Sequence, residues 1–125
     1  MLKVVVLDAN AISRNLLTGV LVNGGYDVIG DANISSAGLA HAIKLQPQII
    51  CIDPSGQGET TFVILDELRN ALPKTLVFLI STSLDSGTFH AALERGIHGF
   101  IIKPFNSVTV LKTIRNAILK LAKQR

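Results

Sequence analysis

The sequence predicts an α/β fold built on a parallel sheet, and three observations lead to this prediction. Short apolar runs rich in β-branched residues alternate with longer segments whose apolar residues recur at helical spacing. Strands that alternate with helices of this length are typical of βαβ units, whose strands lie parallel. No linker or internal repeat divides the 125 residues, so we expect a single domain.

The first half of the chain contains three predicted strands and two predicted helices. The strands are residues 2–7, 26–29 and 49–53, and the helices are residues 11–23 and 36–45. Gly24 and Gly25 end the first helix and Pro47 follows the second, as is usual for these residue types. The first helix carries one apolar stripe, made of Ile12, Leu16, Leu17, Val20 and Leu21.

The second half continues the alternation. It holds predicted strands at 75–80 and 98–102, and predicted helices at 60–72, 86–95 and 107–123. The first of these helices places Phe62, Leu65, Leu68 and Leu72 at helical spacing. The last one has an expected buried stripe of Val108, Leu111, Ile114, Ile118 and Leu121.

Composition excludes several classes of protein. With 48% hydrophobic and 17% charged residues the chain is globular, and its apolar runs are far shorter than the roughly 18 residues that span a bilayer. The start of the chain does not resemble a signal peptide, so we expect a cytoplasmic protein without a membrane partner. The lone Cys51 excludes an internal disulfide and is expected in the core.

The charge is distributed unevenly along the chain. No acidic residue follows Glu94, whereas seven basic ones do: Arg95, Lys103, Lys112, Arg115, Lys120, Lys123 and Arg125. Two interpretations stay open, a solvated helix with cations near its C-terminus or a surface for an acidic partner. Nucleic acid is not expected to be a partner, because aromatic residues and arginine clusters are missing from this stretch.

Polar residues follow four of the predicted strands. Asp8 follows the first strand, Asp53 ends the third, Ser81 follows the fourth, and Lys103 follows the fifth. Because the carboxyl ends of parallel strands meet at one edge of a sheet, these side chains are expected to gather there. Ligands and chemistry of open α/β folds lie at this edge.

Four segments combine in one order and spacing, namely VLD at 6–8, ICID at 50–53, LIS at 79–81 and GFIIKPF at 99–105. By these segments the whole chain resembles a response-regulator receiver domain of the stand-alone chemotaxis type. The resemblance implies a doubly wound five-stranded parallel sheet of order 2-1-3-4-5 with five helices, which is the flavodoxin-like fold. It also implies a single receiver-like domain over residues 1–125 without an output domain.

The resemblance implies a role for each strand-end residue. Asp53 would be the phosphoacceptor of a two-component phosphorelay, modified by a histidine kinase or phosphotransfer protein. Asp8, Asp53 and the backbone carbonyl of Ser55 would hold Mg²⁺. Lys103 would pair with the phosphoryl group, and Ser81 would donate a hydrogen bond to it.

The same resemblance implies how the signal is passed on. Ser81 and Phe100 would be the switch residues, and the Lys103–Pro104 peptide bond would be cis. A downstream protein would bind the surface of the fourth helix, fifth strand and fifth helix, which carries His98 and the basic excess. No enzyme activity is implied beyond self-phosphorylation and self-dephosphorylation of Asp53.

The chain departs from the family pattern at Ala9, where receivers usually have a second acid that ligates the metal. Mg²⁺ binding is therefore expected to be weak or lost, although Asn10 offers a neutral oxygen nearby. The loop with Gly56 and Gly58 also differs from the family. Two readings stay open: a phosphorylated receiver, or a phosphorylation-independent pseudo-receiver that acts as a protein-interaction module.

Two other classes are weaker candidates. A nucleotide-binding domain would need a third glycine after Gly56 and Gly58, and that glycine is missing. A hydrolase could draw on Ser81, His90 and Asp53, but no nucleophile elbow surrounds Ser81. The three histidines of the chain also lack metal-ligand spacing.

Overall fold

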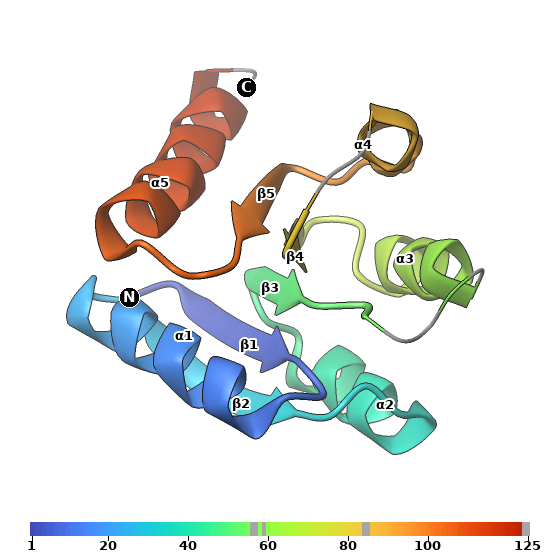
Figure 1. Cartoon of the computed structure of the whole chain (residues 1–125), viewed down its shortest axis with the longest axis horizontal. Coiled ribbons are helices and arrows are strands. Elements are labelled where there is room, and N and C mark those ends of the chain that lie inside the picture. Colours follow the sequence, from blue (N-terminus) through green and yellow to red (C-terminus); the bar gives the residue numbers. More distant parts are fainter. Residues whose placement is uncertain (56–57, 59, 84–85, 124–125) are drawn as a thin grey trace.

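The structure is a computed structural model that describes residues 1–55, 58, 60–83 and 86–123 of the chain (Figure 1). Its elements in chain order are β1 (Lys3–Leu7), α1 (Ala11–Asn23), β2 (Asp27–Ala32), α2 (Ser36–Leu45), β3 (Ile49–Ile52), α3 (Thr60–Ala71), β4 (Leu76–Ser81), α4 (Ser86–Glu94), β5 (Gly99–Ile102) and α5 (Ser107–Lys123). The strands form one parallel sheet in the order β2-β1-β3-β4-β5, which confirms the predicted doubly wound topology.

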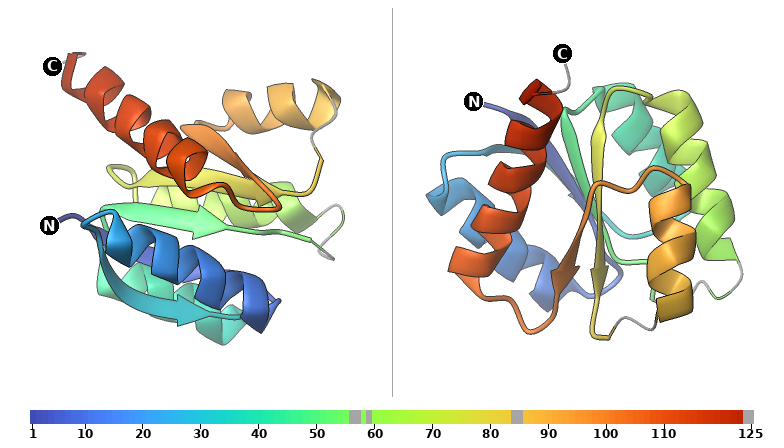
Figure 2. Two further views of the ribbon diagram at one scale, coloured as in Figure 1. Left: turned by 60° about the vertical axis from the view of Figure 1, so that its left-hand side comes forward. Right: turned by 90° about the horizontal axis from the view of Figure 1, so that it is seen from above.

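Helices cover the sheet on both faces. The two views of Figure 2 place α1 and α5 on one side of the strands and α2, α3 and α4 on the other. This arrangement explains why the sequences of β1, β3 and β4 are almost entirely apolar rather than alternating, since both faces of a parallel sheet are buried. None of the helices in the described part of the chain is long and apolar enough to cross a membrane.

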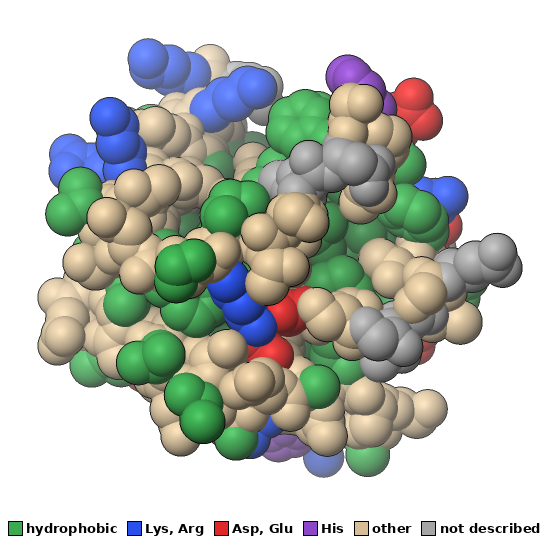
Figure 3. Space-filling model, in the orientation of Figure 1, with side chains coloured by type: hydrophobic (Ala, Val, Ile, Leu, Met, Phe, Trp, Pro, Cys, Tyr) green, Lys and Arg blue, Asp and Glu red, His purple; other side chains and the backbone are tan. Residues whose placement is uncertain are grey.

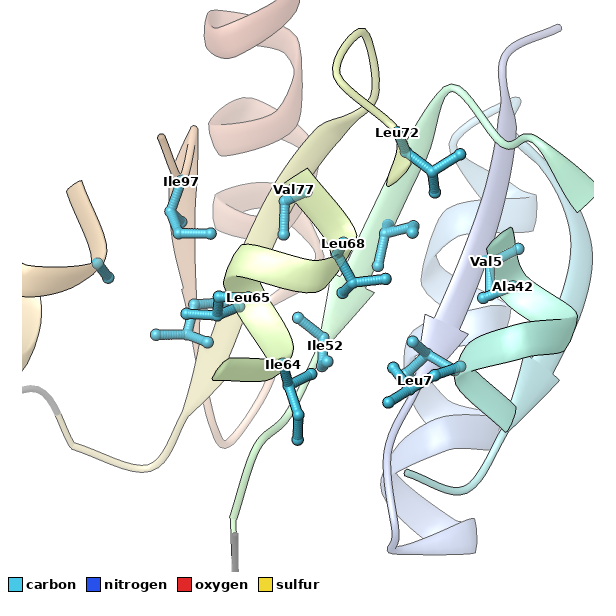
Figure 4. Packing of buried hydrophobic residues seen from close by; sticks show 14 residues of the cluster. Val5, Leu7, Ala42, Ile52, Ile64, Leu65, Leu68, Leu72, Val77 and Ile97 are labelled. Carbon is cyan, nitrogen blue, oxygen red and sulfur yellow. The ribbon is translucent and has the colours of Figure 1, made fainter. Parts of the chain in front are cut away.

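Successive residues of each strand point to opposite faces and enter two separate hydrophobic clusters. Val5 and Leu7 belong to the cluster under α2 and α3, whereas Val4 and Val6 belong to the one under α1 and α5. Figure 4 shows the first cluster, in which side chains of α3 lie over the central strands. Cys51 is fully buried in the second cluster, and burial raises the pKa of its thiol to about 12, so it is a core residue as expected.

The second strand is longer than the prediction of residues 26–29. It begins at Asp27 and continues to Ala32, through Gly30 and Asp31, two residue types that usually favour turns. Pairing with β1 extends along this whole length, with a shift of register between Val4 and Val5. Gly30 fits because a Cβ atom there would come within 2.9 Å of the Leu45 side chain. Long-range pairing and packing therefore override the local preference.

Two of the predicted helix stripes are partly wrong. Ile12 and Leu16 of α1 are 73% and 60% exposed, and Val108 of α5 is 74% exposed. Leu17 and Leu21 are the buried residues of α1, and Val110 is buried in α5. Ile12 and Leu16 directly precede Ser13 and Leu17, and one residue turns a helix by about 100°, so they lie beside the face of α1 that the sheet covers. Figure 2 shows α1 and α5 lying along one face of the sheet, so only the inner side of each helix is buried. In α3 the prediction is confirmed for Leu65 and Leu68, and the buried Leu72 follows directly after the helix.

Candidate functional site

The backbone of the sheet brings Asp8, Asp53 and Lys103 together at its carboxyl edge. Each residue directly follows a strand, and its amide extends the ladder to a neighbouring strand. The amide nitrogens of Asp8, Asp53 and Lys103 donate to the carbonyls of Ala32, Leu7 and Ser81 at 3.0, 2.8 and 2.9 Å. Figure 3 shows basic and acidic side chains meeting near the centre of one face of the molecule.

Lys103 makes an ion pair with both carboxylates. Its Nζ lies 2.5 Å from Asp53 Oδ2 and 3.0 Å from Asp8 Oδ2. The two acidic side chains are 3% exposed and the lysine side chain is 16% exposed, so solvent screens these charges little. One ammonium group thus compensates two buried carboxylates, and the site keeps one net negative charge.

The other oxygen of Asp53 is held by Ser55. The backbone amide of Ser55 donates to Asp53 Oδ1 at 2.8 Å, and its hydroxyl donates to the same oxygen at 2.5 Å. Burial raises the pKa of Asp53, but the Lys103 ammonium and the two Ser55 donors outweigh burial and hold the pKa below its ordinary value. Asp53 is therefore a carboxylate at neutral pH.

The pKa of Lys103 is also shifted by its surroundings. Burial lowers the pKa of its ammonium, but the hydrogen bonds and charges of Asp53 and Asp8 prevail and raise the pKa above its ordinary value. The lysine therefore stays a cation, which suits a group that faces the phosphoryl oxygens in the predicted reaction.

Asp8 is fixed by the start of α1. Its Oδ1 accepts the Asn10 amide at 2.9 Å, and its backbone carbonyl accepts Arg14 Nη1 at 2.8 Å. Its Oδ2 is buried and, apart from the ion pair with Lys103, accepts no hydrogen bond of good geometry. The neutral oxygen that Asn10 offers for a metal ion caps α1 in the structure, since Asn10 Oδ1 accepts the Ser13 amide at 3.0 Å.

The two predicted switch residues lie on β4 and β5, Ser81 at the end of β4 and Phe100 within β5. The Ser81 hydroxyl donates to the Ser83 carbonyl at 2.5 Å and accepts the Ser83 amide at 3.2 Å, so it is engaged with its own loop. Phe100 stacks on Phe89 of α4, with ring centroids 4.6 Å apart. The Lys103–Pro104 peptide bond is cis, as the resemblance implied. Both residues thus lie on the predicted strands. Among the described residues, no hydrogen bond joins the Ser81 hydroxyl to Asp53.

Sequence reasoning missed two contacts of the site, those of the Ser55 hydroxyl with Asp53 and of the Arg14 guanidinium with the Asp8 carbonyl. The sequence does hint at the first contact, because Asp-Pro-Ser is a turn sequence in which an aspartate often accepts donors two residues later. Arg14 gave no signal, since its partner is a backbone carbonyl six residues earlier.

The rival sites are not assembled. His90 is exposed on α4 beside Phe89, and the Ser81 hydroxyl pairs with Ser83, so no serine–histidine pair forms in the part of the chain that the structure describes. Gly56 of the glycine motif lies outside the described residues. Within those residues no group of three or more His, Cys, Asp or Glu side chains is placed to hold a metal ion.

Comparison with known proteins gives consistent matches over nearly the whole chain. The family model of the response regulator receiver domain matches residues 4–115. The transcriptional regulatory protein LnrK of Bacillus subtilis is 29% identical over 119 residues, which cover 91% of this chain and 52% of LnrK. The chemotaxis protein CheY of Thermotoga maritima is 22% identical over 90% of this chain and 93% of its own length.

A solved structure shows the same arrangement. The signal receiver domain of the response regulator NarL from Mycobacterium tuberculosis has a TM-score of 0.79 and 28% sequence identity, and the match covers 99% of this chain and 98% of that domain. This chain spans about half the length of LnrK and most of the length of CheY. The matches therefore concern one domain that occurs in proteins of different length.

Proposed function

The chain belongs to the response regulator receiver domain family, and on this premise we propose that Asp53 accepts a phosphoryl group from a histidine kinase or a phosphotransfer protein. One observation carries the proposal: Asp53 follows β3 at the carboxyl edge of the sheet with Lys103 Nζ 2.5 Å from its Oδ2. A buried, ionised carboxylate beside a fixed cation is the nucleophile that phosphoryl transfer requires.

In the proposed reaction an Asp53 oxygen attacks the phosphorus atom of a phosphohistidine. A P–O bond to Asp53 forms while the P–N bond breaks, and the electron pair of the broken bond stays on the imidazole nitrogen. Lys103 offsets the charge of the phosphoryl oxygens, and its contact with Asp8 holds the ammonium at the site. Beyond gain and loss of this phosphoryl group we propose no enzyme activity.

Receiver domains bind Mg²⁺ at an acidic pocket, and the oxygens present here fit this hard cation. Asp8, Asp53 and the backbone carbonyl of Ser55 would hold the ion, and among the described residues the buried Asp8 Oδ2 is engaged by the Lys103 ammonium alone. When bound, the ion would offset charge on the transferred phosphoryl group. Because Ala9 stands where the family has another acid, we propose that binding is weak.

The proposed signal is a shift between two surface states. In one state the Ser81 hydroxyl pairs with Ser83, as its hydrogen bonds of 2.5 and 3.2 Å indicate, and in the other it turns to the phosphoryl group. The Phe100–Phe89 stack lies between β5 and α4, next to the strand that carries Ser81, so its repacking would change the outer surface.

We propose that the downstream partner is an acidic protein that binds the α4–β5–α5 surface. The helix α5 supplies Lys112, Arg115, Lys120 and Lys123 and contains no acidic residue. Binding to such a partner should weaken as salt is raised from 50 to 500 mM, because screening shortens the reach of exposed charges. Affinity that does not change with salt would contradict an electrostatic contact.

The phosphoacceptor is tested by intact mass after incubation with Mg²⁺ and a small-molecule phosphodonor such as acetyl phosphate. One added phosphoryl group is expected on the wild-type protein and none on Asp53→Asn. A matched control is Asp27→Asn, because Asp27 lies at the opposite end of the sheet, at the start of β2.

The possible results separate the two readings of the sequence. An adduct on the wild type and on Asp27→Asn, but not on Asp53→Asn, supports phosphorylation at Asp53. If the wild type gains no adduct under conditions that modify an ordinary receiver, the proposal is wrong. The chain would then be a pseudo-receiver that acts through protein contacts alone.

A further inference from the structure

A histidine side chain completes the pairing of β5 with β4. The regular register begins with Phe78 opposite Gly99. One step earlier, the His98 amide donates to the Val77 carbonyl at 2.9 Å, and the Val77 amide donates to His98 Nδ1 at 3.1 Å. The ring nitrogen therefore takes the place of a backbone carbonyl as acceptor for a fully buried residue.

The preceding chain explains why a side chain is needed there. Gly96, with φ of 87°, and Ile97 donate their amides to Leu93 and Ala92 in the turn that ends α4. This segment therefore belongs to the helix end rather than to the sheet. His98 is the first residue of the returning chain that reaches β4, and its ring supplies the last acceptor of the ladder.

This hydrogen bond requires one protonation state of the ring. Nδ1 accepts a hydrogen bond only without a proton, so the neutral ring must carry its proton on Nε2. Adding a second proton would turn Nδ1 into a donor that faces the Val77 amide at 3.1 Å. Two donors would then oppose each other beside the core, and the pair would separate.

The surroundings of His98 also disfavour a positive charge. The ring is half-buried, and burial together with the nearby Arg69 of α3 lowers its pKa below the ordinary value. Lys120 of α5 lines the same cavity of about 210 Å³ as His98. At the end of α4, Glu94 is exposed and Arg95 pairs with Asp66 of α3.

We propose that His98 is a proton-sensitive latch, whose neutral ring fastens the amino end of β5 to β4 and whose protonated ring releases it. β5 carries Phe100 and leads into Lys103, so release of its amino end alters the α4–β5–α5 surface. The latch is a property of the fold. Its effect on signalling rests on the proposed function of that surface.

The direction of the pH effect follows from the lowered pKa. The unfolded chain binds a proton at His98 near pH 6.5, whereas the folded chain resists it until lower pH. The stabilisation is therefore complete above about pH 6.5 and declines as the pH falls toward the pKa of the folded state. Acid is expected to open the latch.

The test is hydrogen exchange of the Val77 amide by NMR, at several pH values between 7.5 and 5.0, in the wild type and in His98→Asn. Asparagine places Oδ1 where histidine has Nδ1, so it keeps an acceptor that does not titrate. His41→Asn and His90→Asn serve as matched controls, because His41 lies in α2 and His90 in α4 and neither is part of the β4–β5 ladder. Comparing proteins at one pH cancels the intrinsic effect of pH on exchange.

The expected result is equal protection of the Val77 amide in all four proteins at pH 7.5. At pH 5.0 exchange should be about tenfold faster in the wild type and both controls than in His98→Asn. The ¹⁵N shift of His98 Nδ1 should follow the same pH midpoint in the wild type. If Val77 stays protected while His98 titrates, or if His98→Asn responds to pH as the wild type does, the latch is refuted.

This measurement is independent of phosphorylation, so it separates the two proposals. If His98→Asn fails to fold, the wild-type titration alone decides between a Val77 amide that responds with His98 and one that does not. A protein that cannot be phosphorylated at Asp53 would still show the latch, and a phosphorylated protein with an unresponsive Val77 amide would lack it.

Discussion

Replacing Lys103 with methionine should destabilise the protein strongly at neutral pH and weakly in acid. The substitution keeps a long side chain but removes the only cation within ion-pair distance of Asp8 and Asp53 among the described residues. Both carboxylates are 3% exposed, so neither can recover full hydration in the folded state.

The size of the effect follows from the geometry. Removing one member of a buried ion pair costs about 3 to 5 kcal/mol, because an uncompensated charge stays in the interior. The Lys103 side chain is 16% exposed at the edge of the sheet, where water enters more easily than in the core. We therefore expect a loss near the lower limit, about 3 kcal/mol in the free energy of unfolding at pH 7.

The loss should shrink as the pH falls toward 4. In the wild type Lys103 helps to hold the pKa of Asp53 below its ordinary value, so that stabilisation exists above the unfolded pKa of about 3.9 and disappears below it. In Lys103→Met burial and the two Ser55 donors remain, so the pKa of Asp53 rises relative to the wild type, and the variant takes up a proton at higher pH and loses its buried charge. Urea unfolding followed by circular dichroism at both pH values measures the difference.

Two further variants make this experiment decisive. Lys112→Met removes an exposed lysine of α5 and should change stability by less than about 0.5 kcal/mol. Asp53→Asn combined with Lys103→Met should recover part of the loss, since one buried charge is gone. If Lys103→Met lost less than about 0.5 kcal/mol, or the same amount at pH 7 and pH 4, the ion pair would not be the cause.

Three other changes test separate parts of the structure. Ala9→Asp should strengthen Mg²⁺ binding on the order of tenfold, measured by calorimetry, and unchanged affinity would contradict the assignment of the acidic pocket. Gly38→Ala should cost about 1 to 3 kcal/mol in urea unfolding, because its Cβ would stand 2.2 Å from the Asn33 carbonyl oxygen; an unchanged midpoint would disprove this close approach. Thr75→Val should cost about 1 kcal/mol, since the buried hydroxyl donates to the Pro47 carbonyl at 2.7 Å, and a neutral result would show that bond to be dispensable.

The strand pattern predicted most of the architecture and the centre of the site. Apolar runs that end in Asp8, Asp53 and Lys103 specify where the strands stop, and a parallel sheet necessarily brings such ends to one edge. The structure places the three side chains in contact, as the pattern led us to expect. Local sequence suffices here because strand ends are marked by abrupt changes of polarity.

The pattern was less reliable for the helix faces and for β2. Ile12, Leu16 and Val108 are apolar, yet they are exposed because the sheet covers other faces of α1 and α5, those of Leu17 and Val110. The run Gly30–Asp31 looks like a turn, yet it pairs with β1. In both cases the outcome depends on an element that is distant in sequence.

By itself, the sequence determined the order of elements, the residues at the strand ends and the absence of a second acid at Ala9. Only the tertiary structure decided that Ser55 donates its hydroxyl to Asp53, that Arg14 binds the Asp8 carbonyl, and that His98 accepts the Val77 amide. The reason is physical. Burial of one face of a helix or strand involves many residues, so it produces a periodic pattern in the sequence. A hydrogen bond depends on the distance and direction between two particular atoms, and only the packing of the folded chain sets these.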